Sequence, residues 1–102
     1  MNPLKEQVKM TKGKGNVFAD IGYSEHEAQN LLLRSDLMMK IEDFVEKSNL
    51  TQTEAARRLG ITQPRLNDLM KGKIEKFSLD ALVNMLARAG MQVRLTVKKA
   101  AA

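Results

Sequence analysis

The sequence predicts a mainly α-helical domain, a compact bundle of about five helices followed by one C-terminal β-strand. Two patterns lead to this prediction. Apolar residues recur at helical spacing in several segments, and these segments begin at a serine or threonine that can cap a helix. One segment near the C-terminus instead alternates apolar and polar residues, which is typical of a half-buried strand. At 102 residues, the chain has the length of a single domain.

Composition narrows the class of protein. The absence of cysteine excludes a disulfide framework and any thiolate metal site. No apolar run approaches the roughly 18 residues of a membrane-spanning helix, and the N-terminus offers no apolar stretch for a signal peptide. We therefore expect a soluble cytoplasmic protein without a metal, another cofactor or a membrane partner. The single His26 and the lack of a nucleophile motif also predict that it is not an enzyme.

Charge is unevenly distributed around a net value of +5. Residues 20–49 carry seven acidic and three basic side chains, whereas residues 51–76 carry six basic and three acidic ones. A basic segment favours polyanions such as nucleic acid, although a merely solvated basic surface has the same composition. Residues 1–15 are rich in lysine and predict a flexible basic arm, residues 16–99 a single domain and residues 100–102 a tail.

The first predicted elements are a short connector and a long helix. Asn16–Gly22 contains a small apolar patch and predicts either a brief strand or an anchoring loop. Ser24 and Glu27 have the spacing of a capping box, so a helix should begin at Ser24. No glycine or proline interrupts the chain from there to Ser48. One face of this helix is apolar, with Leu37, Ile41, Phe44 and Val45.

Two short helices follow. The first begins at Thr51, where Thr51 and Glu54 have the spacing of a second capping box, and it ends before Gly60. Glycine at that position accepts a left-handed backbone without a Cβ penalty. The second follows Thr62 and has Pro64 in its first turn, where a missing N–H costs little.

The last helix and the strand complete the domain. Ser78 should cap a helix that stops at Gly90. Residues 92–98 then alternate, and an isolated strand of this kind needs a partner. It can pair with its copy across a two-fold axis, which we favour, or with Val17–Phe18 of the same chain. The predicted dimerisation residues are Val93, Leu95 and Val97.

The two short helices meet the requirements of a helix-turn-helix motif. Ala56 supplies the small side chain that a close helix crossing needs, and Gly60 supplies the tight turn. Leu66 and Leu69 are spaced to face the interior. The outward positions of the second helix are long or polar, namely Gln63, Arg65, Asn67 and Asp68.

Residues 51–70, TQTEAARRLGITQPRLNDLM, resemble the helix-turn-helix of the Cro and phage-repressor (Xre) family. The family's pattern positions are matched by Gln52, Ala56, Gly60, Leu66 and Leu69. The wider stretch from NVFADIG to the final strand is similar to the HigA-like antitoxin branch. Members of that branch repress their own operon and neutralise a HigB/RelE-like ribonuclease toxin.

The resemblance implies that the second helix of the motif enters the major groove by its N-terminal end. Gln63 can then bond adenine and Arg65 can bond guanine, each through two hydrogen bonds. Asn67 and Asp68 are further candidates, Asp68 the weakest because phosphates repel its carboxylate. The family often has Gln or Ser where Pro64 stands, so any contact there is apolar. The predicted phosphate contacts are Gln52, Thr62, Arg57, Lys71, Lys73 and Lys76.

The implied partners are double-stranded DNA with a palindromic operator, a second copy of the chain and, in the antitoxin case, a toxin. A stand-alone Xre-family or phage-type regulator without a toxin remains the alternative. The acidic residues 20–49 could dock a basic toxin or be a solvated helix face. Residues 1–15 could wrap the toxin, enter a minor groove as basic arms do, or be disordered, which is the default expectation.

Overall fold

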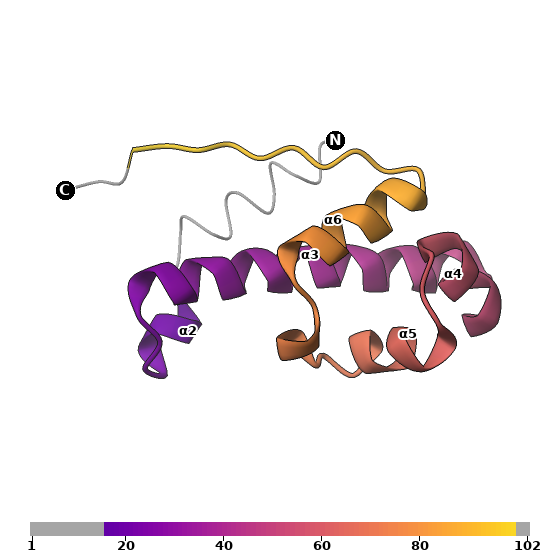
Figure 1. The fold of residues 1–102 in the computed structure, drawn as a ribbon, viewed down its shortest axis with the longest axis horizontal. Helices are drawn as coiled ribbons and strands as arrows, with labels where there is room; N and C mark the ends of the chain where they lie inside the picture. Colours follow the sequence, from indigo (N-terminus) through magenta and orange to yellow (C-terminus); the bar gives the residue numbers. More distant parts are fainter. Residues whose placement is uncertain (1–15, 100–102) are drawn as a thin grey trace.

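The computed structural model describes residues 16–99, in which shorter helices pack against one long helix (Figure 1). Its elements in chain order are α2 (Val17–Asp20), α3 (Glu25–Ser48), α4 (Gln52–Leu59), α5 (Gln63–Met70), the 3-10 helix η1 (Ile74–Lys76) and α6 (Leu79–Arg88). The prediction of a mainly α-helical bundle of about five helices is confirmed for this part of the chain. The predicted basic arm and the three-residue tail lie outside it.

The long helix α3 is the element against which all the others pack. It contacts α2, α4, α5, η1 and α6, and in Figure 1 it runs through the middle of the bundle. The predicted capping box is present: Ser24 accepts from the Glu27 backbone N–H, and the Glu27 carboxylate accepts from the Ser24 N–H. The helix ends at Asn49, whose φ of 60° is left-handed.

One apolar core lies between α3 and the three later helices. Phe77, in the link from η1 to α6, has no exposed surface and sits among aliphatic side chains. Full burial of one such side chain contributes about 1.5–3 kcal/mol. The core therefore holds α4 and α5 against α3. Its buried members are Leu37, Met38, Ile41, Ala55, Ala56, Leu59, Leu66, Leu69, Phe77, Leu82, Met85 and Leu86.

The segment before α3 differs from the prediction. Residues 17–20 form the short helix α2 instead of a strand or a loop. Asn16 caps it, because its side-chain Oδ1 accepts from the Phe18 N–H at 2.9 Å. Since Val17 and Phe18 are helical, the suggestion that they pair with the C-terminal strand is wrong.

The C-terminal segment is extended but forms no β-strand in the part of the chain that the structure describes. Residues 91–99 leave α6 and run back along the length of the molecule (Figure 1). Val93 is partly buried against the core, whereas Leu95 is 66% and Val97 89% exposed. Within the described part of the chain, no backbone hydrogen bond joins residues 92–97 to another element. The predicted strand is thus unconfirmed in a single chain.

No helix among residues 16–99 combines the length and the apolar character needed to cross a membrane.

Candidate nucleic-acid interface

The turn between α4 and α5 has the geometry that a helix-turn-helix motif requires. Gly60 adopts a φ of 75°, and its N–H donates to the Arg57 carbonyl at 3.1 Å. The Ile61 N–H donates to the Ala56 carbonyl at 3.0 Å, which closes the end of α4. A Cβ at Gly60 would collide with the Arg88 side chain. Glycine is therefore favoured here by its left-handed backbone angle, whereas the exposed Arg88 side chain could move away from an added Cβ.

Helix α5 has one buried face and one exposed face. Leu66 and Leu69 have no exposed surface. Gln63 and Asn67, one helical turn apart, are exposed. The Thr62 hydroxyl accepts from the Arg65 N–H at 3.2 Å and caps the helix. For these two leucines and for Gln63 and Asn67, the structure agrees with the sequence prediction, whereas Arg65 and Asp68 are only partly exposed.

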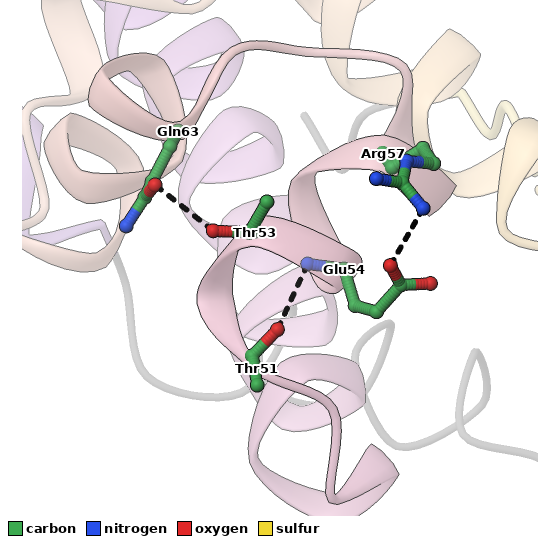
Figure 2. A network of polar contacts seen from close by, with 5 residues as sticks. All are labelled: Thr51, Thr53, Glu54, Arg57 and Gln63. Atoms are coloured by element: carbon green, nitrogen blue, oxygen red, sulfur yellow. Dashed lines mark hydrogen bonds and ion pairs between the residues drawn. The ribbon is translucent and has the colours of Figure 1, made fainter.

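The first outward residue of α5 is held by α4. The Thr53 hydroxyl donates to Oε1 of Gln63 at 3.0 Å, and the amide nitrogen of Gln63 points away from Thr53 (Figure 2). This contact orders the side chain while leaving its two N–H donors directed outward. Thr53 was not among the residues expected from the sequence.

Arg65 is less exposed than the sequence predicts. Its guanidinium carbon lies 4.5 Å from the centroid of the Phe77 ring, and the side chain is half-buried. A cation over an aromatic face is an attractive arrangement. The contact with Phe77 therefore holds the Arg65 side chain in place at the edge of α5.

The carboxylate of Asp68 joins two lysines that follow α5. Lys73 Nζ lies 3.2 Å from Oδ1 and Lys76 Nζ lies 3.3 Å from Oδ2. The hydrogen bond from Lys73, and after it the one from Lys76, lowers the pKa of the Asp68 carboxyl, so the group stays ionised further into acid. Two of the predicted phosphate contacts are therefore already paired with a carboxylate.

Of the other predicted phosphate contacts, Arg57 is paired with a carboxylate, whereas Gln52 and Lys71 are exposed. Arg57 pairs with Glu54 at 2.7 Å, and the Thr51 hydroxyl accepts from the Glu54 N–H at 3.1 Å (Figure 2). Because the Glu54 carboxylate bonds Arg57, only the Thr51 half of the predicted second capping box is formed. Gln52, in the first turn of α4, and Lys71, after the last turn of α5, are exposed.

Arg34 of α3 holds the segment that follows α5 in place, a role that the sequence did not indicate. Its Nη1 donates to the carbonyls of Ile74 and Phe77 at 3.4 and 3.3 Å, and its Nε donates to Asn30 at 2.8 Å. An arginine in a helix with more acidic than basic residues gives no signal of such a role. It ties the link between α5 and α6 to α3.

The structure offers no group of three or more acidic or histidine side chains that could hold a metal ion in residues 16–99.

No curated protein is similar enough in sequence to serve as a relative. A family model described as a helix-turn-helix domain, however, matches residues 17–98, which is most of the chain. The matched residues include α4, the Gly60 turn and the whole of α5. The chain therefore belongs to this family of helix-turn-helix domains, whose motif indicates a DNA-binding protein.

Proposed function

We propose that the protein is a sequence-specific transcriptional repressor that binds a palindromic operator as a homodimer and has no enzymatic activity. The observation that carries the proposal is the exposed polar face of α5. Gln63 and Asn67 lie on that face, while Leu66 and Leu69 anchor the opposite face in the core. A helix held in this way can enter the major groove without losing its packing.

In this proposal Gln63 and Arg65 read bases. The amide of Gln63 can accept from N6 and donate to N7 of adenine, and the guanidinium of Arg65 can donate to O6 and N7 of guanine. Gln52 and Lys71, exposed near the two ends of the α4–α5 unit, can bond phosphates and set the register. Asn67 is a further base-reading candidate.

The dimer is proposed from the C-terminal segment. A single α5 contacts too few base pairs for useful selectivity, and a two-fold dimer places two such helices roughly 34 Å apart. Residues 91–99 are extended and leave Leu95 and Val97 largely exposed. Antiparallel pairing with the same segment of a second copy would cover these side chains.

We further propose that the protein is the antitoxin of a type II toxin–antitoxin system and neutralises a HigB/RelE-like ribonuclease. This proposal is supported by the resemblance of residues 16–98 to the HigA-like branch. Its alternative is a stand-alone Xre-family regulator. A small basic protein encoded next to this chain that co-purifies with it would favour the antitoxin. A solitary gene would favour the alternative.

Selection from a pool of random duplexes tests the DNA-binding proposal. The full chain should enrich a sequence with two related halves whose centres are about 10 base pairs apart. The Gln63→Ala and Asn67→Ala variants should each change the preference at particular positions. Enrichment of no preferred sequence would refute sequence-specific binding.

A further inference from the structure

Asp68 stands out because it lies on the proposed DNA-facing helix and carries the charge that DNA repels. Its two oxygens pair with different lysines, Lys73 Nζ at 3.2 Å and Lys76 Nζ at 3.3 Å. The Asp68 side chain is 27% exposed, against 43% and 50% for the two lysines. The Asp68 side chain is thus the least exposed of the three, and each of its oxygens is paired with one ammonium group.

The two lysines come from the stretch that follows α5. Lys73 lies between α5 and η1, and Lys76 is the last residue of η1. Both would therefore be close to the DNA backbone when α5 lies in the groove. Lysine–phosphate contacts do not depend on base sequence, and they supply most of the affinity for non-target DNA. A carboxylate that already holds both ammonium groups weakens this attraction.

We propose that Asp68 is a specificity-determining residue, which holds Lys73 and Lys76 away from phosphates and so lowers the affinity for non-target DNA. The inference rests on the proposed DNA-binding function. It assigns Asp68 a role other than reading a base. The lowered pKa of the Asp68 carboxyl is consistent with it, because the group remains charged at neutral pH.

The test measures binding of the full chain to an unrelated duplex at several salt concentrations, by fluorescence anisotropy. The Asp68→Asn variant should bind more tightly than the unchanged protein. Its affinity should fall more steeply with salt, by about 0.9 in the log–log slope for each freed lysine. For two lysines, the loss of affinity between 50 and 200 mM salt would grow by up to about twelvefold.

Asp43→Asn is the matched control. Asp43 also pairs with a lysine, Lys47, at 3.1 Å, but this pair lies on α3. Asp43 and Lys47 line a hollow together with Met91, and Figure 1 places the segment after α6 on the opposite side of α3 from α5. The salt slope of this variant should equal that of the unchanged protein.

A second pair of variants separates release of the lysines from simple removal of a negative charge. In a Lys73→Gln/Lys76→Gln background, Asp68→Asn should no longer tighten binding. If it tightens binding equally there, direct repulsion by Asp68 explains the effect and the proposal is overturned.

The double lysine variant should by itself flatten the salt slope by less than about 0.9, the value for one phosphate contact. A loss near 1.8 would mean that both lysines already contact phosphates, which also overturns the proposal.

The outcomes distinguish this inference from the proposed function. A protein that binds no duplex refutes DNA binding itself. A protein that selects an operator, but whose Asp68→Asn variant keeps the original salt slope, refutes only the role of Asp68. Circular dichroism of each variant establishes that it is folded before its binding is compared.

Discussion

Replacing Arg65 by alanine should cost both affinity and a little stability. The contact of its guanidinium with Phe77, at 4.5 Å from the ring centroid, contributes about 0.5–1 kcal/mol if it behaves like an exposed cation–π pair. A two-point contact with guanine contributes about 1–3 kcal/mol of discrimination. Since 1.4 kcal/mol is a factor of ten, affinity for the selected operator should fall by about 5-fold to 140-fold.

The assay compares the Arg65→Ala and Arg65→Lys variants on the selected operator and on its single-base changes. Lysine keeps a cation near the ring but presents a rotatable point charge in place of the rigid planar fork that suits guanine. Arg65→Lys should therefore retain most of the stability in urea unfolding while losing discrimination at one base position. Arg65→Ala should lose both.

Two results would refute this reasoning. If Arg65→Ala weakens every duplex by the same factor, Arg65 acts through its charge alone. If it lowers the free energy of unfolding but leaves base preference unchanged, Arg65 is a packing residue for Phe77 and does not read DNA.

Three further predictions concern the interface, the turn and acid–base behaviour. Leu95→Asp should yield monomers, because a charge would be buried between paired segments; an intact dimer in sedimentation velocity would place the interface elsewhere. Gly60→Ala should lower the free energy of unfolding by about 1–2 kcal/mol through its left-handed φ of 75° alone. Adding Arg88→Ala to Gly60→Ala should relieve the collision with the arginine but not the cost of the left-handed φ. An unchanged urea midpoint for Gly60→Ala would contradict the need for glycine at this turn. Burial, and after it the charge of Glu46, raises the pKa of the Glu42 carboxyl. The folded protein therefore binds a proton at Glu42 more tightly than the unfolded chain does. This proton binding stabilises the fold fully in acid, and the stabilisation is lost as pH rises through the raised pKa. Glu42→Gln should accordingly raise the melting temperature at pH 7 but not near pH 3; an equal shift at both would contradict the assignment.

The helix boundaries could be predicted because each depends on local chemistry. Thr51, Thr62 and Ser78 cap the helices that follow them, as their sequence context predicts. Helix α2 was missed because four residues are too few to show a helical period. The alternation of residues 92–98 indicates two faces, but it carries no information on which chain pairs with them.

The candidate site was predictable only in outline. Helical spacing separates the inward Leu66 from the outward Gln63, and the structure agrees. The partners of the polar side chains could not be inferred. The contact of Gln63 with Thr53 and that of Arg65 with Phe77 each join residues at least ten positions apart. Such contacts depend on how α4, α5 and the link to α6 are placed in space, which no local pattern encodes.

The opposite faces of α5 make the recognition surface open to reprogramming. Gln63 and Asn67 contribute nothing to the core, whereas Leu66 and Leu69 carry the attachment of the helix. Gln63 and Asn67 can therefore be replaced together to direct the domain to another DNA sequence. Each replacement should change the free energy of unfolding by only about 0.5 kcal/mol. Arg65 would be the costly position in such a library, because any uncharged replacement also removes the cation from the ring of Phe77.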